Sequence, residues 1–207
     1  KQILMERFAE HPELSGSLRN YLWEEGVLQS RVVEGKESDA AKFRDYFDYD
    51  EPLKRVPSHR ALAIFRGRKE TYLQVVIATP AAVANADKTR PDIVPERAEL
   101  MIANTFGIAE KGRAADRWLA EVVKWTWKIK LLTRLELDLL GQLRDSAEEE
   151  AIRVFAENMK AILLASPAGS KVTMGLDPGL RTGVKVSLVD ATGKYLEDTA
   201  IYPHAPK

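Results

Sequence analysis

The chain changes character once, near residue 170, and this change constrains the fold more than any other feature. Ahead of it, residues 95–165 place apolar side chains at helical spacing. After it, apolar and polar residues alternate and glycines mark turns. The small residues SPAGS, 166–170, join the two patterns as a linker. The sequence therefore predicts an α+β chain with a mainly helical region over 1–170 and a β-meander over 171–207.

The meander is predicted to contain three strands, over residues 172–176, 183–189 and 195–202. The first two strands have an apolar side, made of Val172, Met174, Leu176, Val184, Val186 and Leu188. A three-stranded sheet is near the lower limit of independent stability. We therefore expect the meander to pack on the helical region, to pair with another copy, or to stay loosely ordered. Proteolysis is expected first between Ser166 and Lys171.

The region before residue 95 is predicted to mix helices and short strands. Ser58 is expected to cap a helix, because serine side chains accept hydrogen bonds from free backbone N–H groups at helix starts. The predicted elements are two helices within 1–26, a strand over 27–33, a helix over 38–47, a loop over 45–58, a helix from Ser58 to Gly67 and a strand over 71–79.

Helix dominates between residues 95 and 165. A helix with Pro95 in its first turn and Gly107 at its end fits the usual positions of these residues. One long or once-broken helix follows over 115–145. Ser146 with Glu149 fits a capping box, which predicts a new helix start at Ser146.

Composition excludes several classes of protein and site. The 207 residues are 45% apolar, enough for a buried core. Lysine and arginine number 31 and aspartate and glutamate also 31, so any binding to nucleic acid must come from local patches. The absence of cysteine excludes disulfides and thiolate zinc sites and indicates a reducing, cytoplasmic location.

No apolar run reaches membrane-spanning length, so we expect no membrane association. The first residues, KQILMERFAE, favour a charged amphipathic helix over a signal peptide. They lack an initiator methionine, which indicates a piece of a longer chain.

Asp177 is a candidate metal ligand. It ends an apolar run and is followed by Pro178 and Gly179, which bend the backbone and leave space beside the carboxylate. Mg²⁺ takes one or two protein carboxylates together with waters and phosphate oxygens. The alternative is turn chemistry, in which the aspartate side chain bonds its own backbone two residues on. From these residues alone, the turn is favoured.

A first basic segment is FRGRKE, residues 65–70. Arg66, Arg68 and Lys69 are suited to phosphate contacts, and Arg60 lies earlier in the same predicted helix. The alternative is structural. In it, Gly67 ends the helix and the cations of the last turn complement its dipole.

A second basic segment is RWLAEVVKWTWKIKLLTR, residues 117–134, in which lysines and tryptophans alternate. Lys124 and Lys128 are candidate phosphate contacts, and an exposed tryptophan would stack on a base. The alternative, which we favour, places the tryptophans in the core with the lysines solvated on the outer face.

Two longer motifs carry a resemblance to a known family. GLDPGLRTGVKVSLVDATGKYLEDTAIY, residues 175–202, resembles the opening of YqgF-type, RNase H-like domains. FRDYFDYDEPLKRVPSHRALAIFRGRKE, residues 43–70, resembles a signature of the bacterial Tex family of transcription accessory proteins. The two motifs occur in the order found in that family. The resemblance implies a helical Tex-type region followed by the start of an RNase H-like α/β domain.

The resemblance implies a nucleic-acid-binding scaffold that takes RNA or DNA and works with the transcription machinery, without a cofactor. Asp177 matches the first carboxylate of an RNase H-like site, while the other acidic positions of that site would lie on later elements. Two hypotheses remain beside this one. The first is a nuclease that uses Mg²⁺ at Asp177. The second is a docking module that contacts protein and no nucleic acid.

Overall fold

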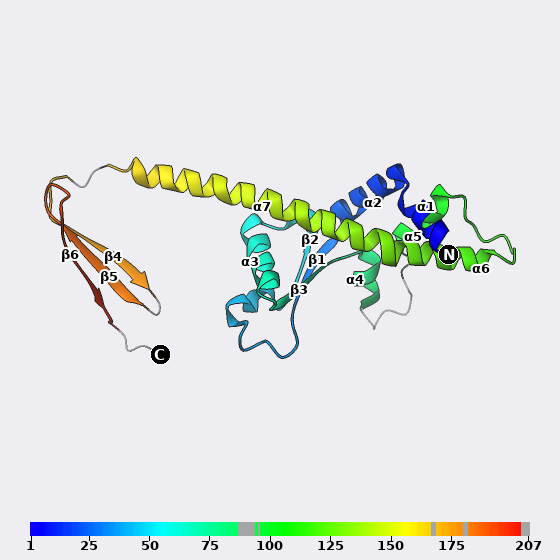
Figure 1. Cartoon of the computed structure of the whole chain (residues 1–207), viewed down its shortest axis with the longest axis horizontal. Coiled ribbons are helices and arrows are strands. Elements are labelled where there is room, and N and C mark those ends of the chain that lie inside the picture. The colour runs from blue at the N-terminus through cyan, green and yellow to red at the C-terminus, as the bar shows by residue number, and fades with distance from the viewer. Residues whose placement is uncertain (87–93, 95, 167–168, 180–181, 204–207) are drawn as a thin grey trace. The chain divides into compact units, whose positions relative to one another are not determined.

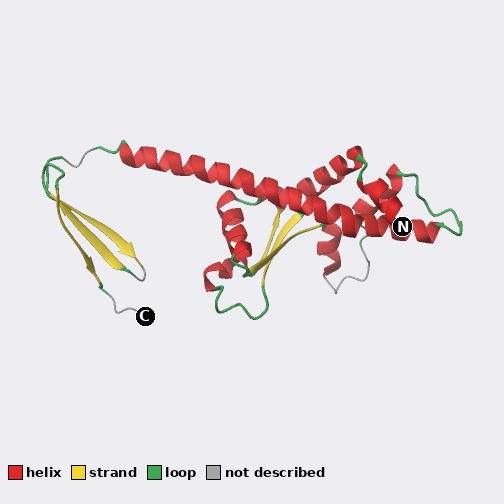
Figure 2. Cartoon of the chain, in the orientation of Figure 1, coloured by secondary structure: helices red, strands yellow, loops and turns green. Residues whose placement is uncertain are grey.

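The computed structural model describes residues 1–86, 94, 96–166, 169–179 and 182–203. The chain forms two compact units, Lys1–Phe155 and Ala156–Lys207. Helices and two small antiparallel sheets make up the described residues, which confirms the predicted α+β class (Figures 1 and 2). None of the helices in these ranges has the length and apolar character needed to span a bilayer.

The elements in chain order are α1 (Gln2–Ala9), α2 (Pro12–Glu25), β1 (Val27–Val32), a 3₁₀ helix (Ala41–Tyr46), β2 (Asp48–Pro52), a second 3₁₀ helix (Leu53–Arg55), α3 (Ser58–Lys69), β3 (Leu73–Ala78), α4 (Pro80–Ala86), α5 (Arg97–Thr105), α6 (Asp116–Trp125), a π-helical segment (Thr126–Leu131), α7 (Leu132–Leu163), β4 (Thr173–Gly179), β5 (Gly183–Val189) and β6 (Tyr195–Ile201).

The first unit is built around the sheet β2-β1-β3, in which both strand pairs are antiparallel. The strand predicted over 71–79 is confirmed as β3, in which Leu73, Val75 and Ile77 are buried. Helices α2, α3 and α7 contribute side chains to the same apolar cluster, among them Leu22, Ile64 and Leu135. The core of this unit therefore joins the sheet to helices from both ends of its sequence.

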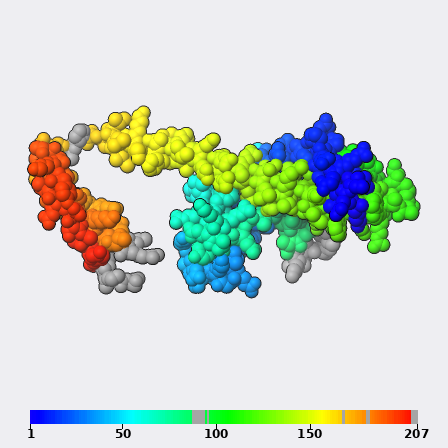
Figure 3. Space-filling view, viewed as in Figure 1, coloured from blue at the N-terminus to red at the C-terminus, as the bar shows by residue number. Residues whose placement is uncertain are grey.

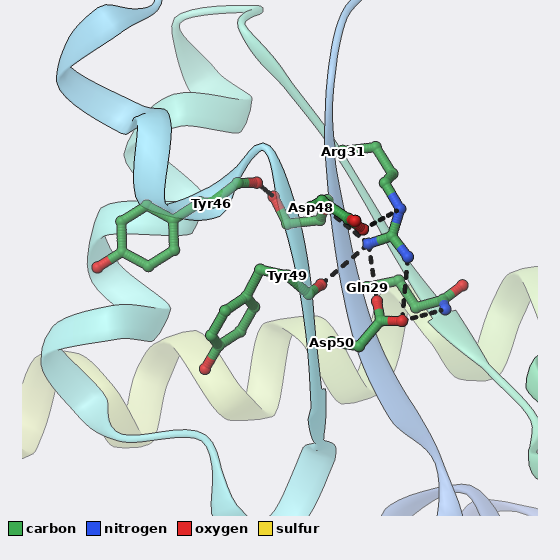
Figure 4. A network of polar contacts seen from close by, with 7 residues as sticks. Gln29, Arg31, Tyr46, Asp48, Tyr49 and Asp50 are labelled. Atoms are coloured by element: carbon green, nitrogen blue, oxygen red, sulfur yellow. Dashed lines mark hydrogen bonds and ion pairs between the residues drawn. The ribbon is translucent and has the colours of Figure 1, made fainter.

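Strand β2 corrects the prediction of a loop over residues 45–58. Its sequence is polar and ends in proline, so no apolar alternation marks it as a strand. It is an edge strand, held by pairing to β1 and by Arg31 of β1, whose guanidinium lies 2.7 Å from Asp50 and 3.2 Å from Asp48 (Figure 4). The hydrogen bond from Arg31 lowers the pKa of Asp50. The buried Ser30 hydroxyl donates to the Tyr46 carbonyl at 2.8 Å.

The predicted helix start at Ser146 and the predicted capping role of Ser58 are wrong. Helix α7 runs without a break through Ser146, whose hydroxyl donates to the Leu143 carbonyl at 3.0 Å. Buried Leu143 and Ala147 continue the apolar face across this point, and their burial holds the helix together. Ser58 is the first residue of α3 and makes no capping bond, because Pro57 occupies the cap position.

Other boundaries differ by less. The helix predicted over 38–47 is the shorter 3₁₀ helix at Ala41–Tyr46. The helix predicted from Pro95 to Gly107 is α5, and Gly107 follows it with a φ of 62°. Pro95 itself and part of the SPAGS segment, residues 167–168, lie outside the described residues.

The second unit contains the sheet β4-β5-β6, again antiparallel throughout, and the three predicted strands are confirmed. The register pairs Met174 with Leu188 and Leu176 with Val186, so the predicted apolar side is a single face of the sheet. Met174 and Leu176 are exposed. Gly183 begins β5 with a φ of 74°, and a Cβ there would lie 2.7 Å from the Ile201 carbonyl oxygen, so the turn requires glycine.

Candidate functional site

The end of α3 is held tightly against β3. Gly67 is buried inside the last turn, and a Cβ at this position would lie 2.5 Å from Cδ1 of Leu73. This corrects the prediction that Gly67 ends the helix, which continues to Lys69. The absent side chain lets α3 approach the sheet closely. The adjacent cations Arg66 and Arg68 are therefore carried by a firmly packed helix end.

A groove of about 1060 Å³ lies between α3 and α7. Figure 3 shows the cyan surface of α3 meeting the yellow-green surface of α7 in this part of the first unit. Four cations and two carboxylates line the groove, and its remaining wall is apolar or glycine. The lining residues are Leu62, Phe65, Arg66, Arg68, Lys69, Glu70, Leu137, Leu140, Gly141, Arg144 and Glu148.

The cations of the groove differ in how they are paired. Glu70 accepts from Lys42 at 2.5 Å and from Arg66 at 2.9 Å. These two hydrogen bonds, Lys42 first, lower the pKa of Glu70. Arg68 and Lys69 form no ion pair within the described ranges. Both are therefore available to an anionic ligand.

Arg144 is the groove residue that sequence reasoning missed. Its guanidinium lies 3.6 Å from Asp145 and 3.8 Å from Glu148, longer than a hydrogen bond. In the sequence it is one charge among several on a predicted helix, with no spacing that links it to FRGRKE. Only the packing of α7 beside α3 brings it to Arg68 and Lys69.

Arg60 is placed away from this groove. Its guanidinium lies 3.5 Å from Glu51 and 5.8 Å from the centre of the Tyr49 ring, so it contacts β2. Of the four cations that the sequence grouped on this helix, the structure brings three together.

Lys124 and Lys128 line a different pocket, of about 670 Å³, together with Thr79, Glu96 and Glu99. Burial raises the pKa of Glu99, and the two lysines partly oppose this shift. Because these lysines face carboxylates, they are less suited to phosphate than Arg68 and Lys69.

The tryptophans of this segment divide between core and surface. Trp127 is buried, with 1% of its surface exposed, as the core hypothesis predicts. Trp118 and Trp125 are exposed, which the same hypothesis did not expect. The ammonium of Lys1 lies 5.1 Å from the centre of the Trp125 ring.

Asp177 lies within β4, which continues to Gly179, and its cross-strand partner is Lys185. Its side chain is exposed. Across the described ranges, no three histidine, aspartate or glutamate side chains gather where they would hold a metal ion. The later aspartate of this motif, Asp190, serves the β5–β6 turn, accepting from the backbone N–H of Thr192 at 2.8 Å and of Lys194 at 3.0 Å.

Comparison with known proteins covers the whole chain. The family described as Tex central region-like matches residues 1–155, and the Tex protein YqgF-like domain matches residues 171–207. The chain is 52% identical to protein YhgF of Escherichia coli over 205 residues, 99% of this chain. It is 48% identical to protein tex of Bordetella pertussis over 208 residues, 100% of this chain. It spans 26% of the length of each of these relatives.

More distant relatives match over a similar range. The chain is 44% identical to the transcriptional accessory protein Tex of Neisseria gonorrhoeae over 99% of this chain and 26% of that protein. It is 25% identical to human S1 RNA-binding domain-containing protein 1 over 99% of this chain and 20% of that protein. The order and extent of the family matches, together with these identities, show that the chain belongs to the Tex family.

Proposed function

We propose that the first unit, Lys1–Phe155, binds nucleic acid through the groove between α3 and α7 and so acts as a binding platform in transcription. The observation that carries this proposal is that Arg68 and Lys69, which form no ion pair within the described ranges, line one groove together with Arg144 and apolar side chains. Lysine and arginine side chains neutralise phosphates, and apolar side chains are suited to sugars and bases.

The relatives support the same proposal. One is named a transcriptional accessory protein and another an S1 RNA-binding domain-containing protein. Because the chain has no net charge, affinity would rest on a few phosphate contacts and be weak at physiological salt.

The test reverses the two unpaired charges. Fluorescence anisotropy would measure the binding of labelled single-stranded RNA, single-stranded DNA and duplex DNA to the 207-residue chain at several salt concentrations. We expect Arg68→Glu with Lys69→Glu to weaken binding. If two phosphate contacts are lost, the slope of log K against log salt, which is negative, becomes less steep by about 1.4 on single strands and about 1.8 on duplex.

A matched control reverses Lys124 and Lys128, which face carboxylates in the other pocket. We expect this control to leave the affinity close to that of the parent chain. Equal binding by the Arg68/Lys69 variant and the parent would overturn the proposal. Loss of binding only in the control would move the interface to the tryptophan segment. Circular dichroism of each variant checks that the fold is intact.

A further inference from the structure

Position 141, in the interior of α7, is glycine, although no neighbouring atom within the described residues would prevent a larger side chain there. A Cβ at this position would meet nothing within 4 Å. Glycine is among the least favourable residues for a helix interior, because it loses the most backbone freedom and exposes the peptide groups. Gly67 differs in this respect, since there the close approach of Leu73 explains the missing side chain. The open space at Gly141 therefore faces outward, at a position that lines the groove.

The surroundings of Gly141 are amphipathic on the groove side. Leu137, one turn earlier on α7, is 60% exposed, and Leu140 beside it is buried in the floor. Arg144 follows one turn later. Along this side of α7, the apolar Leu137 is therefore followed by Gly141, which has no side chain, and then by the cation Arg144.

Gly141 also borders a surface that is acidic, in contrast to the basic groove. A second hollow, of about 790 Å³, also touches Gly141 and is lined by Asp138, Asp145 and Glu149. Arg19 lies in this hollow and is paired with Asp138 at 2.8 Å. An anionic chain in the basic groove would meet carboxylates if it moved past α7. Gly141 therefore lies on the border between an attractive and a repulsive surface.

We infer that Gly141 is the point at which a sugar–phosphate backbone comes closest to α7, with Leu137 as its apolar contact and the acidic hollow as the limit of its path. The inference rests on the proposed function and names the residue that sets the ligand's approach. The absence of a side chain exposes the peptide backbone of the helix and leaves room for the bulky sugar–phosphate chain.

The experiment fills the gap with a good helix former. We expect Gly141→Leu to weaken binding of the labelled oligonucleotides roughly tenfold, which is the effect of one strong contact. We expect the same variant to raise the urea midpoint of unfolding, because leucine is favoured over glycine in helices and the position is open. A residue with a merely structural role would not move stability and affinity in opposite directions.

Gly16 of α2 provides a matched control, because a Cβ there also meets nothing within 4 Å and it is not among the residues that line the groove. We expect Gly16→Leu to raise the urea midpoint without changing affinity. Gly141→Ala is a second variant that adds only a methyl group, and it should retain more binding than Gly141→Leu.

The outcomes separate this inference from the proposed function. Unchanged affinity in Gly141→Leu, with weakened binding in the Arg68/Lys69 variant, overturns the role of Gly141 and leaves the groove in place. Unchanged affinity in both overturns the groove and the inference together. A lower urea midpoint in both Gly141 variants would show that the glycine is structural and would also overturn the inference.

Discussion

The two sheets of this chain have the same architecture and different cover. Each has three antiparallel strands, and in each an edge strand carries apolar residues at alternate positions, Leu73 and Val75 of β3 and Met174 and Leu176 of β4. In the first, Leu73 of the edge strand β3 is 3% exposed and belongs to a cluster with side chains of α2, α3 and α7. In the second, Leu176 of the edge strand β4 is 61% exposed. Alternation therefore specifies a strand, whereas the burial of its apolar face depends on which elements pack against it.

The largest expected effect is the difference in stability between alanine variants of these two leucines. Leu73→Ala should lower the free energy of unfolding by about 2–5 kcal/mol, because it leaves a cavity in a packed cluster. Leu176→Ala should change it by about 0.5 kcal/mol or less, as exposed substitutions do. Urea denaturation followed by circular dichroism measures both. A loss at Leu176 as large as that at Leu73 would mean that the second sheet is covered in solution.

A smaller effect is expected from glycine substitutions near the same sheets. Gly67→Ala should destabilise the first unit by about 1–3 kcal/mol, because the new Cβ would lie 2.5 Å from Leu73. In β4, Gly175 is the control, since its nearest neighbour, the Ser187 carbonyl oxygen, lies 3.9 Å away. Gly175→Ala should be neutral or slightly stabilising. Equal thermal midpoints for the parent and Gly67→Ala would show that α3 is less tightly packed on β3 than the structure indicates.

Asp116 should make the stability of the first unit depend on pH. Its carboxylate accepts from the backbone N–H groups of Lys111 and Arg113 and from the Arg113 side chain, which lower its pKa from 3.8 to about 2. A lowered pKa stabilises the folded state above pH 3.8, and this contribution is lost as the pH falls through about 2.

Urea unfolding of the parent and of Asp116→Asn at several pH values tests this. The difference between the two should be constant above pH 3.8 and shrink as the pH approaches 2. A difference that does not change with pH would contradict the assigned hydrogen bonds. Asp190→Asn is the corresponding change in the β5–β6 turn, where bonds from Thr192 and Lys194 also lower the pKa.

The smallest effect is expected at Asp177. Asp177→Asn should change the free energy of unfolding by less than about 0.5 kcal/mol, because the side chain is exposed. We also expect neither this variant nor the parent to cleave RNA or DNA in the presence of Mg²⁺, because Asp177 has no partner carboxylates in a metal-binding group within the described ranges. Magnesium-dependent cleavage by the parent that is absent in a folded Asp177→Asn variant would revive the nuclease hypothesis.

Local pattern was enough to predict several elements of both sheets. β3 was predicted from its short β-branched run, and the three later strands from alternating residues and glycine-bearing turns. The same reasoning missed β2, whose polar residues carry no such signal and whose place is fixed by pairing to β1. It also placed a helix start at Ser146, where a capping pattern occurs by coincidence inside a helix held by burial.

Sequence alone was enough for most of the helices, for the strands other than β2, for the change near residue 170 and for the run of cations at Arg66, Arg68 and Lys69. These features depend on neighbours within a few positions, where the backbone geometry is fixed by the type of element. Three features become visible only in the folded chain: Arg144 and Gly141 line the groove with these cations, Arg60 contacts β2, and Lys124 shares a pocket with carboxylates. Arg144 and Gly141 lie far along the chain from α3, and only the packing of α7 beside α3 brings them to Arg68 and Lys69.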